Sequence, residues 1–188
     1  MLKILQILDF DTFGDKIFDI AVRVDKFVDF FWLRIKNQNT RFIFDTAKNL
    51  TNYIDREKII ISEHCDIASI LTLHGAHLNK NSIPTNFIKY TFPNLTIGYS
   101  AHSIEEIQTI EADYYTLSPI FNTKKSYPVK PLGLDFKLPK NKKIFALGGI
   151  NKNNINFIIN KGFHGIAGIR FFNELKEMRM LLNRLTCR

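Results

Sequence analysis

The stretch IGYSAHSIEEI, residues 97–107, joins a β-strand pattern to a helix pattern without a linker. Its first three residues favour a strand, and Ser103 with Glu106 three positions later forms the capping box that often opens a helix. Ser100 and His102 lie between the two, in a short turn. A strand that passes into a helix through polar residues indicates a β–α unit, and it marks this turn as a candidate functional position.

The same unit recurs along the chain: a short run of β-forming residues, one or two polar residues, then apolar residues at helical spacing. The expected strands are residues 2–8, 30–35, 58–61, 75–78, 96–99, 114–117, 143–147 and 165–169. The expected helices are residues 15–28, 40–56, 64–73, 84–91, 103–111, 133–137, 151–161 and 172–185. Strict alternation implies parallel strands with helical crossovers, and eight units predict an α/β fold, a single compact (β/α)8 TIM barrel over residues 1–188. An open, doubly wound sheet is the alternative.

Length and composition fit one globular domain. The chain has 188 residues, 45% of them hydrophobic, and single domains commonly hold about 100–200 residues. No apolar run reaches the ~18 residues of a membrane span. The apolar segment 1–9 is interrupted by polar residues and lacks the small-residue cleavage site of a signal peptide. We therefore expect a soluble, cytoplasmic protein that does not enter a membrane.

The net charge of +8 indicates an anionic partner without specifying it. Nucleic acid, an anionic membrane surface and small phosphorylated ligands all suit such a charge. The lysines are scattered rather than clustered, which argues against nucleic acid. Cys65 and Cys187 lie far apart and match no zinc or redox spacing, so reduced thiols are expected. The oligomeric state stays open, and a homo-oligomer is compatible with the sequence.

Polar residues that follow the expected strands form the candidate site, because the active sites of such barrels lie at the carboxyl ends of the strands. On the second strand, Trp32, Arg34 and Lys36 alternate and so share one face. Two cations on the inner face of a barrel are costly unless an anion meets them, which favours a ligand contact. Snorkelling side chains at the rim are the alternative. The rim residues are Asp9, Arg34, Lys36, Ser62, Glu63, Asn79, Lys80, Ser100, His102, Ser118, Gly148, Gly149, Gly168 and Arg170.

The stretch KIFALGGI, residues 143–150, indicates an anion site. A strand that runs through paired glycines into a helix exposes backbone N–H groups at the positive end of the helix dipole, where a phosphate can bind. Asn151 would cap that helix. A tight turn without a ligand is the alternative. Gly168 and Arg170 at the next strand end favour the phosphate, because barrels often bind phosphate with the loops after strands seven and eight.

His102 differs from the other four histidines by its position at this rim. His64 and His74 lie in or beside the third expected helix and His164 precedes the last strand, so these three favour packing or surface roles. His77 lies within the fourth strand, where a hydrogen-bonded core residue is the usual case. His102 stands at the first turn of a helix, whose dipole favours the neutral imidazole that a general base requires.

Three segments together resemble the thiamine phosphate synthase and TenI superfamily: IGYSAHSIEEIQTIEADYYTLSPIFNTK (97–124), KIFALGGIN (143–151) and HGIAGI (164–169). Members of this superfamily carry Gly-x-Ser-x-His after strand five, Pro-Ile-Phe-x-Thr after strand six and Ile-Gly-Gly-Ile after strand seven. The likeness extends to LRIK on strand two and GAHLN on strand four. Each motif alone is modest, and their order over most of the chain carries the resemblance.

The resemblance implies a barrel of cytoplasmic thiamine biosynthesis that binds a thiazole phosphate. In the synthase branch, a pyrimidine diphosphate ionises to a carbocation that the thiazole nitrogen captures, and Mg²⁺ neutralises the departing diphosphate. The resemblance places the thiazole phosphate near Gly148, Gly149, Gly168 and Thr123. The other candidate residues for substrate and phosphate binding are Arg34, Lys36, Ser118 and Arg170.

This chain departs from the synthase pattern at the acidic metal ligands. It has Ser62 and Glu63 where synthases have Asn-Asp, and HLNKNS, residues 77–82, where they have a carboxylate after strand four. Amides and a hydroxyl cannot supply the charge that a hard cation demands, and Lys80 opposes it. Trp32 replaces a Gln that reads the pyrimidine. We therefore expect no metal cofactor, with Glu63 as a Mg²⁺ ligand only if the chain is a synthase.

The TenI branch fits these departures better, so we expect a thiazole tautomerase, an isomerase that moves the exocyclic double bond of thiazole carboxylate phosphate into the ring. One proton is removed and one returned, so His102 would shuttle the proton and Ser100 would orient substrate or imidazole. Arg170 replaces a small Ser and would strengthen phosphate binding or block the site. Two alternatives stay open: a Mg²⁺-dependent thiamine-phosphate synthase, which is a transferase, and an inactive precursor-binding or regulatory barrel blocked around Trp32 and Arg170.

Overall fold

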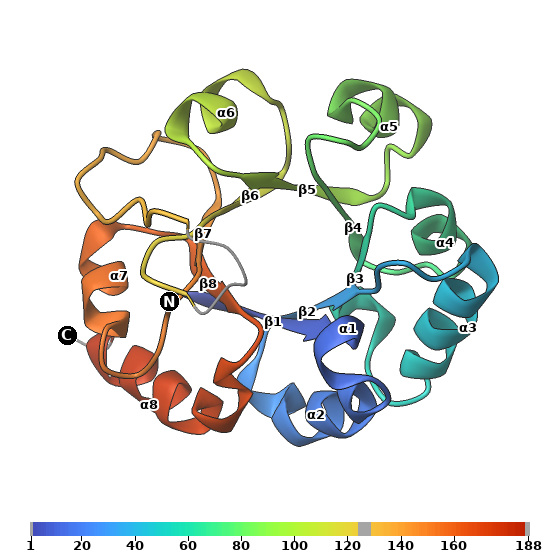
Figure 1. Cartoon of the computed structure of the whole chain (residues 1–188), viewed down its shortest axis with the longest axis horizontal. Helices are drawn as coiled ribbons and strands as arrows, with labels where there is room; N and C mark the ends of the chain where they lie inside the picture. The colour runs from blue at the N-terminus through green and yellow to red at the C-terminus, as the bar shows by residue number, and fades with distance from the viewer. Residues whose placement is uncertain (1, 124–128, 187–188) are drawn as a thin grey trace.

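Eight parallel strands close into a barrel surrounded by helices (Figure 1). The computed structural model describes residues 2–123 and 129–186. Strands that follow one another in the sequence pair side by side, and β1 pairs with β8 to complete the ring. The closed ring confirms the predicted (β/α)8 barrel and excludes the open sheet. The strands are β1 (Lys3–Asp9), β2 (Phe30–Arg34), β3 (Ile59–Ser62), β4 (Gly75–Leu78), β5 (Thr96–Ala101), β6 (Tyr114–Leu117), β7 (Ile144–Leu147) and β8 (Gly165–Gly168).

Helices follow the strands in the expected order, with some shifted ends. The predicted segment 15–28 divides into an α-helix and a 3₁₀ turn, and a short helix that was not predicted follows β1 directly. The α-helices are α1 (Phe10–Phe13), α2 (Lys16–Val24), α3 (Thr40–Leu50), α4 (Cys65–Ile70), α5 (Thr85–Thr91), α6 (Ile104–Thr109), α7 (Ile155–Lys161) and α8 (Leu175–Thr186). The 3₁₀ helices are η1 (Asp25–Phe27), η2 (Arg56–Lys58) and η3 (Phe171–Asn173).

The helix expected at 133–137 is wrong, because the described residues between β6 and β7 form no helix. Their backbone groups bind elsewhere. The N–H of Leu132 donates to the carbonyl of Pro119 (2.8 Å), and the N–H of Gly133 donates to that of Ile120 (3.1 Å). Gly133 also has a left-handed φ of +69°, which a helix does not allow. Residues 132 and 133 are therefore hydrogen-bonded to the loop after β6, and the segment packs on the barrel without forming a helix.

Alternate residues of each strand fill the barrel interior. Leu5 and Ile7 of β1, Trp32 of β2, Tyr114 of β6 and Phe145 of β7 pack together there, and none is more than 6% exposed. Strand residues of the opposite parity point outward and form the larger core under the helices. The interior is therefore a packed, partly aromatic core that separates the carboxyl-terminal rim from the amino-terminal end of the barrel.

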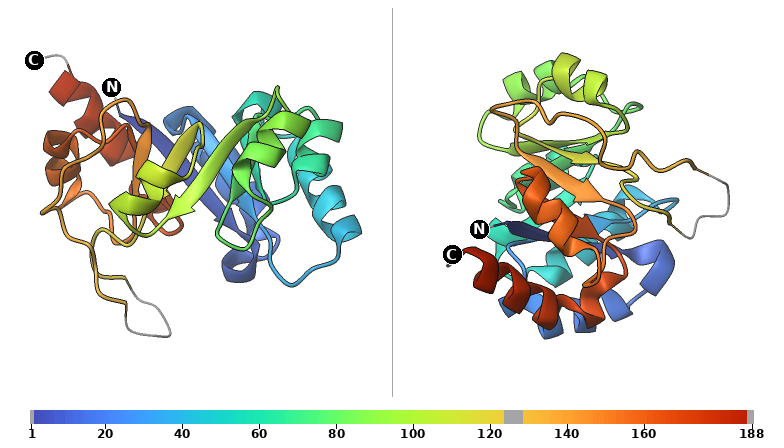
Figure 2. Two further views of the ribbon diagram at one scale, coloured as in Figure 1. Left: turned by 90° about the horizontal axis from the view of Figure 1, so that it is seen from above. Right: turned by 90° about the vertical axis from the view of Figure 1, so that its left-hand side faces the viewer.

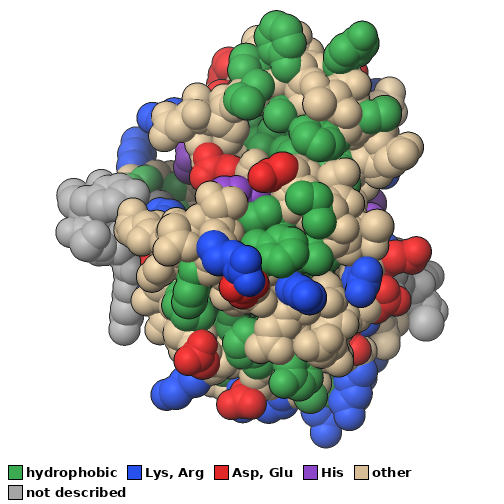
Figure 3. Space-filling model, turned by 90° about the vertical axis from the view of Figure 1, so that its right-hand side faces the viewer, with side chains coloured by type: hydrophobic (Ala, Val, Ile, Leu, Met, Phe, Trp, Pro, Cys, Tyr) green, Lys and Arg blue, Asp and Glu red, His purple; other side chains and the backbone are tan. Residues whose placement is uncertain are grey.

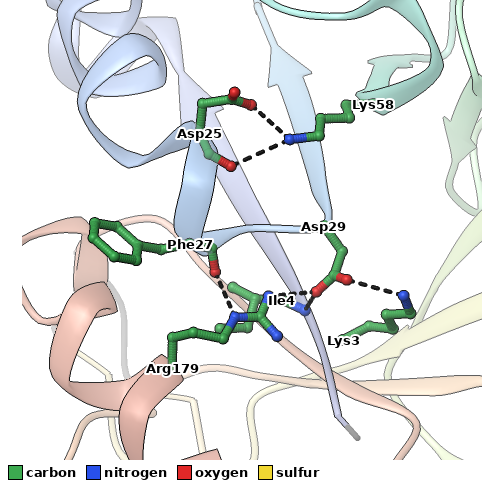
Figure 4. Close-up of polar contacts among 7 residues, drawn as sticks. All are labelled: Lys3, Ile4, Asp25, Phe27, Asp29, Lys58 and Arg179. Atoms are coloured by element: carbon green, nitrogen blue, oxygen red, sulfur yellow. Dashed lines mark hydrogen bonds and ion pairs between the residues drawn. The ribbon is translucent and has the colours of Figure 1, made fainter. Parts of the chain in front are cut away.

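An ionic network at the amino-terminal end of the barrel ties α8 to the first two strands (Figure 4). Asp29 accepts hydrogen bonds from Arg179 (2.6 Å), from Lys3 (2.9 Å) and from the N–H of Ile4 (2.8 Å). Arg179 also donates through Nε to the carbonyl of Phe27 (2.8 Å). Burial alone would raise the pKa of Asp29, but these hydrogen bonds outweigh it and lower the pKa. Charge as well as apolar contact therefore fixes α8 to the barrel.

Two surface features stand out. Between β6 and β7, the described residues on either side of positions 124–128 extend beyond the barrel in both side views (Figure 2). Hydrophobic side chains gather at the top of the face shown in Figure 3. The large hydrophobic residues that are exposed on α4, on α5 and in the loop between them are Ile70, Ile83, Phe87 and Tyr90. No helix within the described ranges is both long and apolar enough to cross a lipid bilayer.

The described thiol is that of Cys65, which is buried and free. Burial raises its pKa to about 11, so the group is a neutral thiol near pH 7. Cys187, the other cysteine, lies outside the described residues.

Candidate active site

Three polar side chains form a hydrogen-bonded chain through the barrel and reach the carboxyl-terminal rim at Ser100. The hydroxyl of Tyr114 lies 2.9 Å from Nδ1 of His77, and Nε2 of His77 lies 3.0 Å from Oγ of Ser100. Oγ1 of Thr116 lies 3.3 Å from the same Nε2. Tyr114 and His77 are buried, whereas Ser100 is only partly buried. Ser100 is therefore the end of this chain that a ligand can reach.

The strand register explains why His77 and Tyr114 meet. His77 pairs with Gly98, and Gly98 pairs with Tyr114, so the two side chains flank a glycine on the intervening strand. A Cβ at Gly98 would lie 2.2 Å from the Tyr114 ring and 2.5 Å from Nδ1 of His77. Only glycine at this position leaves room for the contact.

The neighbours of His77 allow two arrangements of its proton. Burial lowers the pKa of His77 to about 3, so its imidazole is neutral near pH 7 and carries one N–H. Burial also raises the pKa of Tyr114, so its hydroxyl keeps its proton and can either donate to Nδ1 of His77 or accept from it. We propose the arrangement in which Tyr114 donates to Nδ1 and the N–H on Nε2 donates to Oγ of Ser100. In that arrangement His77 does not use the O–H of Ser100, which can donate to a ligand.

His102 lies on the same rim, just after β5, and is exposed. Its Nδ1 lies 2.9 Å from the carbonyl oxygen of Ser118. A carbonyl only accepts, so Nδ1 carries the proton and Nε2 presents a lone pair, which is the form of a general base. Its backbone N–H donates to the side chain of Glu106 (2.7 Å), while Ser103 caps α6 by accepting from the N–H of Glu106 (3.2 Å). The capping box therefore holds the main chain of His102 in place.

The paired glycines after β7 pack against the loop after β6. Gly148 and Gly149 have positive φ values of +99° and +70°. A Cβ on Gly148 would lie 2.9 Å from Pro119 and 3.3 Å from the methyl group of Thr123, and a Cβ on Gly149 would lie 2.5 Å from the carbonyl oxygen of Asn122. The structure thus brings the glycine turn against Pro119 and Thr123. Pro119 directly follows Ser118, whose carbonyl oxygen accepts from His102.

The turn does not lead directly into a helix, contrary to the expectation that Asn151 caps one. α7 begins at Ile155 with Asn154 as its N-cap, and Asn151 instead accepts from the N–H of Asn153 (2.9 Å). Asn154 donates to the carbonyl of Gly149 (2.9 Å). Among the hydrogen bonds of the described residues, none starts from the N–H of Gly149. The turn therefore offers an anion the free N–H of Gly149 rather than the dipole of a helix.

At the end of β8, Gly168 and Arg170 have different surroundings. A Cβ on Gly168 would lie 2.5 Å from the ring of Phe171, so close packing requires glycine there. Arg170 is exposed at the N-cap of η3. Within the described ranges its side chain makes no hydrogen bond or ion pair, and it remains available to an anion.

Arg34 has a partner within the protein that the sequence pattern does not predict. It forms an ion pair with Asp9, the residue directly beside it on β1, and Thr12 also donates to Asp9. The anion that offsets the inward cation is therefore Asp9. Lys36, expected on the same inner face, follows the end of β2 and is exposed.

Trp32 lies inside the barrel below Arg34. It stacks on His77 with a centroid distance of 3.9 Å and donates from its indole N–H to Oγ of Ser62 (2.8 Å). Trp32 is 6% exposed and so contributes to the floor of the site rather than projecting across its opening.

Glu63 is the acidic group that follows β3. One of its oxygens, Oε1, accepts from the amide of Asn79 (2.8 Å) and from the hydroxyl of Ser82 (3.1 Å), both in the loop after β4. The other oxygen accepts no bond from the described residues. Within those residues, no three His, Cys, Asp or Glu side chains are grouped as a complete metal site would require. A cation bound at Glu63 would take most of its coordinating oxygens from a bound substrate and from water.

The chain is a (β/α)8 barrel with an imidazole, a serine hydroxyl, a glycine turn and an exposed guanidinium at the carboxyl ends of its strands, the end at which enzymes of this fold carry their active sites. The chain belongs to the TMP-TENI family, whose model, described as thiamine monophosphate synthase, matches residues 14–172.

Individual relatives agree with the family. A thiamine-phosphate synthase of Pyrococcus furiosus is 31% identical over 163 residues, which are 81% of this chain and 78% of that protein. An Aquifex aeolicus protein provisionally named thiamine-phosphate synthase 2 is 32% identical over 182 residues, 92% of this chain and 98% of that one. The solved structure of thiamine phosphate pyrophosphorylase from Pyrococcus furiosus superposes with a TM-score of 0.77 at 25% identity and covers 96% of each chain. These comparisons support an enzyme of thiamine biosynthesis, and they favour the synthase alternative over the tautomerase that we expected from the sequence.

Proposed function

We propose that this protein is a thiamine-phosphate synthase, a transferase that joins a pyrimidine diphosphate to a thiazole phosphate. The observation that carries the proposal is the near full-length likeness to proteins named for that activity, both in sequence and in structure. Both proposed substrates are small phosphorylated molecules, in keeping with the net charge of +8. We expect the reaction to take place in the cytoplasm.

In this proposal the thiazole phosphate binds at the glycine turn. The free N–H of Gly149 would donate to the phosphate, and Thr123 lies close enough to the turn to add its hydroxyl. Exposed Arg170 would supply the countercharge from the next strand end. The O–H of Ser100, which His77 leaves free to donate, would orient one substrate at the centre of the rim.

The residues around Glu63 fit a Mg²⁺ ion that takes most of its ligands from diphosphate and water. Mg²⁺ is commonly bound by one or two carboxylates together with substrate phosphates. Glu63 would hold the ion through the oxygen that Asn79 and Ser82 leave free. The ion would supply positive charge that stabilises a departing diphosphate. Lys36, exposed on the rim, would add charge of the same sign.

A direct assay tests the proposal. Purified protein with the pyrimidine diphosphate, the thiazole phosphate and Mg²⁺ should form thiamine phosphate. Glu63→Gln should lower kcat/KM by about 10–100-fold, the range typical of a weakened metal site. Glu111→Gln is the matched control, because this exposed carboxylate precedes β6 at the opposite end of the barrel. Failure to form thiamine phosphate at any Mg²⁺ concentration would overturn the proposal.

A thiazole tautomerase is the second candidate, and one observation favours it. His102 presents a lone pair on Nε2 at the rim because its Nδ1–H donates to Ser118. Such a group could take a proton from the non-aromatic thiazole and return it at another atom. The protein would then aromatise that tautomer without Mg²⁺, and His102→Ala would abolish the gain over buffer. If aromatisation is no faster than in buffer, this candidate is wrong.

A further inference from the structure

A cavity of about 370 Å³ opens at the amino-terminal end of the barrel, opposite the rim described above. Its lining includes residues that directly precede strands, namely His74 before β4, Asp113 before β6, Lys143 before β7 and His164 before β8. Volumes of about 300–1,000 Å³ are typical of small-molecule sites. Nothing in the proposed synthase reaction uses this end of the barrel.

The inner wall of the cavity is apolar and aromatic. Leu5 and Ile60 line it together with the rings of Tyr114 and Phe145, which meet edge to face at 5.5 Å. The Phe145 ring lies over Gly165, where a Cβ would come within 2.5 Å of it. The two rings thus cap the cavity from above and offer a surface on which a planar ligand can pack.

Two histidines at the mouth of the cavity pack against aromatic rings. His74 stacks on Phe30 at 4.7 Å, and His164 packs edge to face on Phe145 at 5.4 Å. Burial lowers the pKa of both imidazoles, which leaves them neutral near pH 7.

Two of the residues that line the cavity are charged, Asp113 and Lys143, and they differ in their hydrogen-bond partners. Asp113 is held by Lys89 (2.7 Å) and by the N–H of Ile97 (2.8 Å), so its charge is already met. Lys143 is exposed and makes no hydrogen bond or ion pair through its side chain within the described ranges. Of the two charged side chains in the lining, Lys143 is therefore the one that can receive an acidic group of the ligand.

We propose that this cavity is a second ligand site, which binds a small planar aromatic carboxylate with its ring against Tyr114 and Phe145 and its carboxylate at Lys143. The site is separate from the rim, and the proposal stands whether or not the protein is a synthase. Its ceiling residue Tyr114 also bonds His77, so the cavity and the rim share one side chain.

The five histidines make the location measurable. His74 and His164 lie at the cavity, whereas His64 and His102 follow β3 and β5 at the opposite end. With ¹⁵N-histidine-labelled protein, titration of 2-naphthoate should shift the resonances of His74 and His164 saturably and leave those of His64 and His102 in place. Neutral 2-naphthamide should bind more weakly, by about fivefold, because it lacks the charge for an exposed lysine.

Two variants test the contacts. Lys143→Gln should weaken 2-naphthoate about fivefold, and Lys48→Gln, an exposed lysine on α3, should not weaken it. Thr96→Phe should abolish binding by filling the cavity that Thr96 lines. If Thr96→Phe does not fold, Lys143→Gln still decides the matter. The absence of saturable shifts at millimolar 2-naphthoate, shifts at His64 and His102 instead, or equal binding of the amide would each overturn the proposal.

Discussion

Tyr114→Phe removes one hydroxyl from the interior of the barrel and leaves its ring in place. That hydroxyl lies 2.9 Å from Nδ1 of His77, to which we propose that it donates, and both side chains are buried. The ring of Tyr114 keeps its contacts with Phe145 at 5.5 Å and with His77 at 5.3 Å, so little apolar packing is lost. The substitution leaves a buried imidazole nitrogen without a partner, and such an orphaned acceptor costs about 1–3 kcal/mol. We expect the free energy of unfolding to fall by that amount.

The same change should alter the direction of the hydrogen bond at Ser100. With no donor at Nδ1, the proton of His77 is no longer required on Nε2. In the Nδ1–H form, Nε2 becomes an acceptor, and the O–H of Ser100 turns to His77 instead of to the ligand. Loss of one hydrogen bond of about 1 kcal/mol predicts a decrease in kcat/KM of about fivefold.

Urea unfolding, ¹⁵N NMR of His77 and steady-state kinetics measure these three effects together. Tyr115→Phe is the matched control, because the hydroxyl of Tyr115 donates to the carbonyl of Ile110 (2.6 Å) and accepts from the N–H of Ala112 (2.9 Å), away from His77. It should cost stability without changing the tautomer or the kinetics. If Tyr114→Phe leaves His77 in the Nε2–H form at unchanged stability, the proposed direction of the chain is refuted.

Three further predictions concern stability and the glycine turn. Asp29→Asn should lower the free energy of unfolding by about 2 kcal/mol at pH 7, because it leaves Arg179 with a neutral partner. Since folding lowers the pKa of Asp29, the stability that the carboxylate contributes is lost as the pH falls below about 4. Urea melts of wild type and variant should therefore converge in acid. Because folding lowers the pKa of His77 to about 3, the free energy of unfolding should decrease as the pH falls below about 6.5, by up to about 1.4 kcal/mol per pH unit. His77→Gln should reduce this pH dependence, and an unchanged dependence would contradict a buried, neutral His77. Gly149→Ala should lower the free energy of unfolding by more than the ~1–2 kcal/mol of a left-handed backbone, because its Cβ would lie 2.5 Å from the carbonyl oxygen of Asn122, and it should weaken thiazole phosphate binding. Gly162→Ala is the control: this glycine has a φ of +90° and its Cβ would meet no atom within 4 Å, so the variant should show the backbone cost alone.

Local patterns in the sequence determined the architecture and the rim. Strand and helix periodicities depend on neighbouring residues, so eight alternating units were sufficient to predict the barrel, and the residues after each strand were sufficient to place His102 and the glycine turn at one end. The capping box at Ser103 was confirmed for the same reason. The helix at 133–137 failed because its backbone groups bind the distant residues Pro119 and Ile120, which no local pattern records.

Only the tertiary structure decided which polar groups meet. Asp9 and Arg34 are 25 positions apart, and His77 and Tyr114 are 37 apart; each pair forms because of the register between parallel strands. In a closed barrel, register and parity decide which side chains share the interior, and both depend on the packing of all eight strands together. The sequence therefore determined where function can be, while barrel closure decided that Arg34 binds Asp9 and that Ser100 ends a buried chain of hydrogen bonds.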